Sequence, residues 1–333
     1  MSDLDDLRLQ LENFRGDFEG LRAEVGKVIV GQRNIIDGTL IALVAGGHVL
    51  LEGVPGLGKT LLVRTLANCL QVEFSRVQFT PDLMPADLIG TNVMIEADDG
   101  SRRFQFQQGP LFGNIILADE INRATPKTQS ALLEAMQEHS VTVGGNTYRL
   151  PEPFLVMATQ NPLEMEGTYP LPEAQLDRFL AKLDVKYPSA ADMATILDRT
   201  TSTEDCAAMG VTSGSRILEM RKLARQIPIA HEIRDAAIQM VLATHPDNPL
   251  ATDLVKRYVR YGASPRGAQA MILYAKVLAI LDGRVHVARD DLRTAAVPTL
   301  GHRMILNFAG QAEQVSPDRI LNDILGNVLK AAA

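Results

Sequence analysis

Apolar residues in the first part of the chain recur at alternating intervals of three and four positions. Between residues 4 and 28 the pattern comprises Leu4, Leu7, Leu11, Phe14, Phe18, Leu21, Val25 and Val28. This spacing places them on one face of a helix. The face could form a coiled coil with a partner, but packing against the chain's own next domain is favoured. Gly16 and Gly20 weaken any long free-standing helix here.

After residue 33 short apolar runs alternate with helices. A helix is predicted over 34–45, followed by an apolar run at 48–52 that has the character of a buried strand. Further strand-like runs lie at 74–79, 114–118 and 154–159, with helical stretches between them. This alternation is typical of a parallel sheet covered by helices on both faces, so we predict a three-layer α/β fold.

Two segments with period-two alternation interrupt that order. Each is a pair of short runs around a turn signal: 92–96 and 102–107 around Asp98-Asp99-Gly100, and 141–143 and 147–150 around Gly144-Gly145-Asn146. Both are predicted to be β-hairpins that project from the core.

The character of the chain changes at Tyr187-Pro188-Ser189, where the proline disfavours a continuing helix or central strand. Residues 190–326 show helical periodicity and no convincing strand, which predicts a second, all-helical domain. The expected organisation is an N-terminal helical segment (1–25), an αβα core with two hairpin inserts (26–188) and a helical C-terminal domain (189–333).

A phosphate-binding loop is the clearest chemical signal. Gly53-Val54-Pro55-Gly56-Leu57-Gly58-Lys59-Thr60 matches G-x-x-x-x-G-K-[ST] directly after a predicted strand and before a helix. The glycines let backbone N–H groups face the phosphates, and the helix N-terminus adds its positive dipole end. Lys59 is expected to reach the β- and γ-phosphates and Thr60 to bind Mg²⁺, so ATP and Mg²⁺ are the predicted cofactors.

Polar side chains follow two other predicted strands. Asp119 and Glu120 end the apolar run 115–118, and Gln160-Asn161-Pro162 follow the run 154–159. The ends of parallel strands meet at one edge of the sheet, so these side chains are expected beside the phosphate loop. Asp119 suits the coordination sphere of Mg²⁺, and Glu120 suits activation of the attacking water. Asn161 is the better candidate to orient that water and contact the γ-phosphate.

Composition and charge narrow the class of protein. Hydrophobic residues make up 46% of the chain and charged residues 22%, as in ordinary globular proteins. The net charge of −7 argues mildly against a general DNA binder.

Cys69 and Cys206 cannot build a disulfide framework or a zinc site. The N-terminus is acidic and the apolar run 38–51 is shorter than the roughly 18 residues of a membrane span, so we expect a cytoplasmic protein.

The order of these motifs, followed by a helical domain, resembles the AAA+ ATPases and is more narrowly similar to the MoxR family. The resemblance runs from about residue 25 to 305. The stretches that carry it are Gly53 to Thr60, Leu117 to Ala124, Gln129 to Glu138, Ala158 to Pro162 and Glu166 to Phe179. It implies a C-terminal lid, and it implies that the two hairpins line the central pore of a ring.

The resemblance also assigns roles to single residues. Asn161 corresponds to sensor 1, and Arg178 resembles the arginine finger that completes a neighbouring subunit's site. Arg123 is a second candidate for that contact, and an intramolecular ion pair of Arg178 with Asp177 or Glu173 is the structural alternative. Arg266, at a predicted helix start, resembles sensor 2 and is expected to reach the nucleotide from the lid.

The expected catalytic and binding sets can then be stated in full. The catalytic residues are Lys59, Glu120, Asn161 and Arg178, and the metal ligands are Thr60 and Asp119. The nucleotide-binding residues are Val30, Gly31, Gln32, Gly53, Val54, Pro55, Gly56, Leu57, Gly58, Lys59, Thr60, Leu61 and Arg266. Within this set, 30–32 resembles the segment that packs against adenine.

The resemblance implies a ring of identical subunits, expected to be a hexamer, that uses ATP hydrolysis to remodel, mature or activate protein clients. Proteins with von Willebrand factor A domains are the partners it suggests. A nucleic-acid motor is an alternative, but only Arg102 and Arg103 at the first hairpin tip favour it. A metal-chelatase motor subunit and a non-hydrolysing scaffold are further alternatives.

Overall fold

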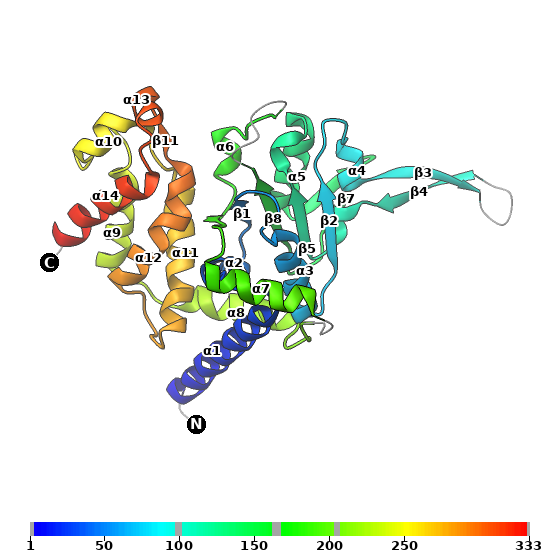
Figure 1. Ribbon diagram of the computed structural model, residues 1–333, viewed down its shortest axis with the longest axis horizontal. Coiled ribbons are helices and arrows are strands. Elements are labelled where there is room, and N and C mark those ends of the chain that lie inside the picture. The colour runs from blue at the N-terminus through cyan, green and yellow to red at the C-terminus, as the bar shows by residue number, and fades with distance from the viewer. Residues whose placement is uncertain (1–2, 97–101, 162–167, 203–206, 332–333) are drawn as a thin grey trace.

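The computed structural model describes residues 3–96, 102–161, 168–202 and 207–331. A sheet with helices on both sides lies beside a group of C-terminal helices, and one long hairpin extends away from both (Figure 1). The first hairpin's turn, Asp98-Asp99-Gly100, lies outside the described residues, as do Pro162, Glu166, Gly167 and Cys206. No helix within the described ranges is long and apolar enough to cross a membrane.

The central sheet has five parallel strands in the order β2–β5–β8–β1–β9. The strands are β1 (Val49–Glu52), β2 (Phe74–Gln78), β5 (Ile115–Asp119), β8 (Leu155–Gln160) and β9 (Ala181–Asp184). The four strands predicted from the sequence are confirmed. The edge strand β9 was not predicted, because its four residues form neither an apolar run nor an alternation long enough to recognise.

Alternating strand residues point to opposite faces of the sheet and so define the three layers. Leu51, Leu117 and Met157 belong to one core, which also holds apolar residues of α1 (Asp3–Val28), α2 (Arg33–Ala45) and α3 (Lys59–Leu70). Their neighbours Leu50 and Ile116 belong to the other core, with apolar residues of α4 (Pro85–Ile89) and α5 (Pro126–Glu138). The predicted αβα layering is confirmed.

Helix α1 packs against its own chain. Leu11, Phe14, Phe18, Leu21 and Val25 are buried, and the helix contacts α2, α3 and α11. The favoured interpretation of the N-terminal apolar stripe is therefore confirmed for this face, because burial against the core leaves it unavailable to a coiled-coil partner.

Both predicted hairpins are present, with strands slightly displaced from the predicted limits. The first is β3 (Gly90–Glu96) with β4 (Arg102–Gln108), and the second is β6 (Ser140–Val143) with β7 (Asn146–Arg149). The rings of Phe106 and Tyr148 stack with centroids 4.2 Å apart, which joins the base of the first hairpin to the second.

The C-terminal part is mainly helical. Its helices are α7 (Ala190–Thr201), α8 (Gly214–Gln226), α9 (His231–Leu242), α10 (Asp253–Tyr258), α11 (Pro265–Leu281), α12 (Arg289–Leu300), α13 (Phe308–Ala312) and α14 (Pro317–Ala331). The prediction of no strand here is wrong at one point: β10 (Val259–Tyr261) pairs antiparallel with β11 (Ile305–Leu306). Segments of three and two residues carry no periodicity, and only the tertiary contact brings them together.

Helices α7 and α8 lie below the sheet near α1, apart from most of the helices of the C-terminal group (Figure 1). Helix α8 contacts α2, and Arg221 in α8 donates a hydrogen bond to the carbonyl of Leu43 in α2. A domain boundary at residue 189 thus remains a prediction, with α7 and α8 packed on the core side.

Candidate nucleotide-binding site

The phosphate loop connects β1 to α3. Gly56 and Gly58 have φ values of 85° and 76°, in the left-handed region that favours glycine. Lys59, the first residue of α3, folds back so that its Nζ donates to the carbonyls of Gly53 at 2.5 Å and Val54 at 3.2 Å. Burial lowers the pKa of Lys59, and the charges of Asp119 and Glu120 oppose that shift. A phosphate would offer this ammonium group stronger acceptors than the two carbonyls.

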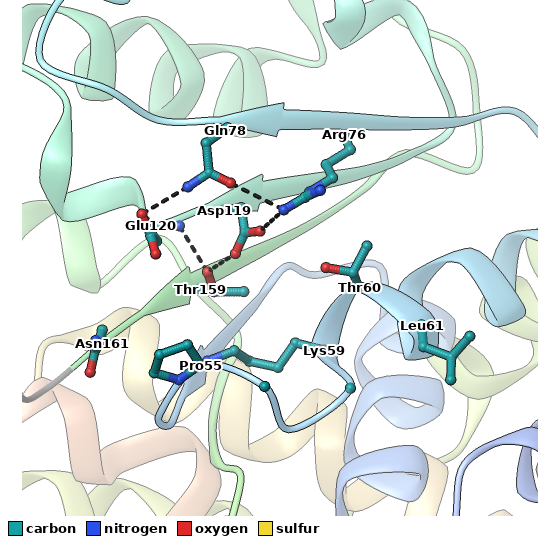
Figure 2. A pocket seen from close by; sticks show the side chains of 12 residues that line it. Pro55, Lys59, Thr60, Leu61, Arg76, Gln78, Asp119, Glu120, Thr159 and Asn161 are labelled. Atoms are coloured by element: carbon teal, nitrogen blue, oxygen red, sulfur yellow. Dashed lines mark hydrogen bonds and ion pairs between the residues drawn. The ribbon is translucent and has the colours of Figure 1, made fainter. Parts of the chain in front are cut away.

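A cavity of about 380 Å³ lies between the loop and the ends of the strands (Figure 2). It brings together Lys59, Thr60, Asp119, Glu120 and Asn161, all predicted from the sequence to act here. Asn161 is only 7% exposed. The strand ends and the helix N-terminus therefore converge on one site, as parallel topology requires.

Asp119, the last residue of β5, is held on both carboxylate oxygens. Oδ1 accepts a hydrogen bond from Thr159 Oγ1 at 2.6 Å, and Oδ2 pairs with Arg76 Nη2 at 2.7 Å. Thr159 Oγ1 in turn accepts the backbone N–H of Glu120 at 2.8 Å. One hydroxyl on β8 thus fixes the carboxylate of one acid and the backbone of the next.

Glu120 follows the strand in a left-handed conformation, with φ 56°. Its Oε2 accepts hydrogen bonds from Gln78 Nε2 and Arg123 Nη1, both at 2.8 Å. Arg123, the second candidate for a contact with a neighbouring subunit, is here bound to an acid of its own chain.

Three residues of this site were not predicted from the sequence: Arg76, Gln78 and Thr159. All line the cavity, and Arg76 Nη2 also donates to Gln78 Oε1 at 3.1 Å (Figure 2). The available signal was the presence of Arg76 and Gln78 at alternate positions of the strand, on either side of the apolar Val77. Their register beside β5, with Gln78 opposite Asp119, needed the structure.

A second cavity of about 310 Å³ adjoins the first and shares Pro55, Gly56, Gly58 and Leu61 with it. It is lined by mainly apolar side chains, among them Val30, Leu57, Tyr187, Met193 and Ile196, together with Gln32. An apolar cavity next to a phosphate loop suits an adenine base. Helix α7 was not expected to contribute to it.

Gly31 makes the turn that places residues 30–32 beside this cavity. Its φ is 72°, and a Cβ there would lie 2.4 Å from Cγ of Asp192. Gln32 Nε2 donates to the carbonyl of Lys186 at 2.8 Å, which fixes the turn to the segment before α7. The predicted base-binding segment is thus held next to α7.

Arg178 and Arg266 lie elsewhere. Together they line a separate cavity of about 220 Å³, and neither lines the two cavities at the phosphate loop. The expected contact of Arg266 with its own nucleotide pocket is therefore not formed: its guanidinium lies 3.8 Å from Asp177 Oδ2. The lid helix α11 begins beside Asp177 rather than beside the phosphate loop.

The intramolecular ion pair considered for Arg178 is not formed within the described part of the chain. Arg178 Nη1 donates to the carbonyl of Leu133 at 2.6 Å, whereas Asp177 binds Ser264 and Arg303.

His302 is buried and hydrogen-bonded to the carbonyl of Phe179, as expected of a packing residue. Burial holds its pKa well below the usual value.

The donors at the phosphate loop fit a magnesium ion that arrives with a nucleotide. Thr60 and Asp119 present a hydroxyl and a carboxylate to one cavity, and Mg²⁺ prefers such oxygen ligands with phosphates and water completing the shell. Across the described ranges no group of three His, Cys, Asp or Glu could hold a metal by itself. The site is thus suited to a metal–phosphate complex.

Two family profiles match the chain: the ATPase family associated with various cellular activities (AAA) at residues 48–181, and an AAA lid domain at residues 251–324. Fold and site define a P-loop ATPase of the AAA+ class with a C-terminal lid. Chaperone MoxR1 of Mycobacterium tuberculosis is 43% identical over 94% of this chain and 85% of its own length. The chain belongs to the MoxR family of AAA+ ATPases.

Two further similarities extend over nearly the whole chain. Protein MoxR of Paracoccus denitrificans is 32% identical over 90% of this chain and 91% of its own. A crystal structure of a candidate ATPase from Cytophaga hutchinsonii superimposes with a TM-score of 0.90 at 41% identity, covering 98% of both chains. The resemblance drawn from the sequence is confirmed.

Proposed function

We propose that this AAA+ ATPase assembles into a ring, with a hexamer as the expected form, and uses Mg-ATP hydrolysis to remodel or activate protein clients. One observation supports the ring above all. The phosphate-loop cavity holds Lys59, Thr60, Asp119 and Glu120, while Arg178 lines a different cavity of the same chain. A complete catalytic set thus needs two chains.

Each group in the phosphate-loop cavity has a chemical task. Lys59 and the loop N–H groups bind the phosphates, and Thr60 with Asp119 hold the metal ion. Bound Mg²⁺ supplies positive charge to the phosphate oxygens. Glu120 accepts a proton from the attacking water, and Asn161 orients that water. Glu120 must first exchange its contacts with Gln78 and Arg123 for a contact with water.

The second chain contributes arginine. Arg178 and Arg266 line one cavity, so a neighbour docked there would present its γ-phosphate to both. An arginine placed where the transition state spreads its negative charge is worth roughly 10³ to 10⁵ in rate. Arg266 thereby keeps its sensor role but acts on the neighbour's nucleotide, which revises the expectation of a contact in its own pocket.

The client-binding role is assigned to the hairpins. The first hairpin bears Met94 and Phe104, which lie opposite each other and are 58% and 74% exposed. Its base stacks on the second hairpin through Phe106 and Tyr148, so movement of one must displace the other. The relative MoxR1 is named a chaperone, which supports protein clients; partners with von Willebrand factor A domains are the class that the resemblance suggests.

The test is steady-state ATPase activity across protein concentration, with Glu120→Gln alongside and sizing of the assembly at each concentration. We expect the specific rate to rise with the fraction of assembled protein and to vanish in the variant, which should still bind ATP. A monomer with full specific activity would refute the shared site. Turnover in Glu120→Gln would refute the role of Glu120.

A further inference from the structure

The segment that carries Arg178 is bound by the lid on both sides of that residue. Arg303, in the turn η3 (Gly301–Arg303) after α12, donates to the carbonyls of Asp177 at 3.0 Å, Phe179 at 2.7 Å and Leu180 at 3.4 Å. His302 adds a hydrogen bond of 3.1 Å to the Phe179 carbonyl. The lid thus holds the backbone immediately before and after Arg178.

The carboxylate of Asp177 is the second part of this junction. It accepts hydrogen bonds from Arg303 Nε and Ser264 Oγ, both at 2.9 Å, and lies near Arg266. Arg303, Ser264 and Arg266 all belong to the lid, whereas Asp177 belongs to the core and directly follows α6 (Glu173–Leu176). One carboxylate therefore binds both the segment at the start of α11 and the turn that follows α12.

We infer that Asp177 is a positioning residue through which the lid of each subunit places Arg178 against the nucleotide of its neighbour. Asp177 and Arg303 are here named the lid latch. The inference rests on the proposed action of Arg178 across the subunit interface. It adds the route by which the lid angle of one subunit sets the catalytic rate in the next.

The latch is a rigid connection for a physical reason. Arg303 is only 8% exposed, and a buried guanidinium is tolerated when its N–H groups are bonded, as they are here. Breaking one bond would leave a buried donor or charge without a partner, which is costly. The lid can therefore rotate only by taking residues 177–180 with it.

Arg178 itself is anchored on the core side, since its Nη1 donates to the carbonyl of Leu133 in α5. The backbone on either side of Arg178 is thus hydrogen-bonded to the lid, whereas its guanidinium group is hydrogen-bonded to the core. A rotation of the lid thus changes the direction of the side chain relative to α5. Because Arg178 must reach a phosphate in the neighbouring chain, this change alters the rate of hydrolysis there. It requires no new contact in the nucleotide pocket of the subunit that carries Arg178.

The lid latch lies at the cavity that holds Arg178 and away from the chain's own nucleotide pocket. Asp177 and Arg303 line the cavity of Arg178, and neither lines the two cavities at the phosphate loop. The apolar cavity beside the phosphate loop is instead lined by residues of α7. A defect in the latch is therefore expected to affect the neighbour's site more than its own.

Mixed assemblies separate these two effects. Donor subunits carry Glu120→Gln, which removes hydrolysis but keeps Arg178; acceptor subunits carry Arg178→Ala and keep an intact nucleotide pocket. Each alone should be inactive, and the mixture should regain ATPase activity at acceptor sites next to donors. Asp177→Asn is then added to the donor in one mixture and to the acceptor in another.

When Asp177→Asn is in the donor, we expect the ATPase activity of the mixture to fall roughly tenfold, which corresponds to the free energy of one charge-assisted hydrogen bond. When it is in the acceptor, we expect a loss of less than about twofold. Ser264→Ala should repeat the pattern if Asp177→Asn does not fold. Glu173→Gln, an exposed acid on the same segment, is the matched control.

Equal losses in both arms, a larger loss in the acceptor, or no loss in either would overturn the inference. Failure of the unmodified mixture to regain activity, with mixed assemblies present by sizing, would instead reject the action of Arg178 across the interface and the inference with it. The two failures are thereby distinguished.

Discussion

The hydroxyl of Thr159 donates a 2.6 Å hydrogen bond to Asp119 Oδ1, so a neutral side chain on one strand orients the proposed metal ligand on the next. The same oxygen accepts the N–H of Glu120. Asp119 at the end of β5 and Glu120 directly after it are therefore placed by β8 as well as by their own strand.

Thr159→Val should lower kcat by roughly tenfold or more, because Asp119 loses its donor and the N–H of Glu120 loses its acceptor. The free energy of unfolding should fall by about 1–3 kcal/mol, the cost of an unsatisfied buried donor. ATPase kinetics and urea unfolding measure both effects. Thr159→Ser keeps the hydroxyl and should stay near the wild type; equal activity of the two variants would contradict the assignment.

Arg76→Met should strengthen metal binding at the phosphate loop severalfold. The guanidinium of Arg76 contacts Asp119 Oδ2 at 2.7 Å, and a metal ion bound by Asp119 competes with it for that carboxylate. Titration with Mn²⁺ in the presence of ADP, followed by electron paramagnetic resonance, reports the affinity directly. Arg76→Lys keeps the charge and should bind the metal more weakly than Arg76→Met. Weaker binding in Arg76→Met would mean that Arg76 supports the metal site.

Gly31→Ala should weaken nucleotide binding. The left-handed φ of 72° and the 2.4 Å approach of a Cβ to Asp192 force the turn to move away from α7, which lines the base-side cavity. Binding of a fluorescent ATP analogue measures the loss, which we expect to be about tenfold, the equivalent of 1.4 kcal/mol.

The matched control is Gly16→Ala in α1, where a Cβ would meet no atom within 4 Å. That variant should leave nucleotide affinity unchanged and stabilise the protein by up to about 1 kcal/mol, because alanine favours a helix. Equal nucleotide affinity in the two variants would show that the turn at Gly31 does not shape the site.

His48 predicts a pH dependence of stability. Burial lowers its pKa to about 4, and its neutral ring accepts from Val156 N and donates to the Met136 carbonyl. The unfolded chain takes up a proton near pH 6.5 but the folded chain does not until near pH 4. This group's contribution is therefore complete above pH 6.5 and falls by up to about 3 kcal/mol as the pH drops towards 4.

Urea unfolding between pH 7 and 4, followed by circular dichroism, tests this. In His48→Gln the amide can still donate and accept, and the decline should be shallower, with the rest due to other groups such as buried His302. His231→Gln, at an exposed position, should keep the wild-type slope. An unchanged slope in His48→Gln would exclude the buried ring as the cause.

Much of the fold followed from local patterns. The helix of residues 3–28, the strands β1, β2, β5 and β8 and both hairpins depend on periodicity and turn residues, and the structure confirms them. The strands β9, β10 and β11 were not predicted, because these short segments carry neither an apolar run nor an alternation long enough to recognise. Lys59 and Thr60 were predicted from the phosphate-loop motif, and Asp119, Glu120 and Asn161 were predicted because they lie at the ends of strands on the same edge of the sheet.

The sequence alone determined which residues are candidates to bind phosphate and metal, since the phosphate loop and the pair Asp119-Glu120 carry their chemistry within a few neighbouring residues. Only the tertiary structure decided what surrounds them. It placed Arg76 and Gln78 of β2 on the two acids, and it placed Arg266 beside Asp177 instead of beside its own phosphate loop. Such contacts join residues more than 40 positions apart by register and domain packing, which no short-range pattern records.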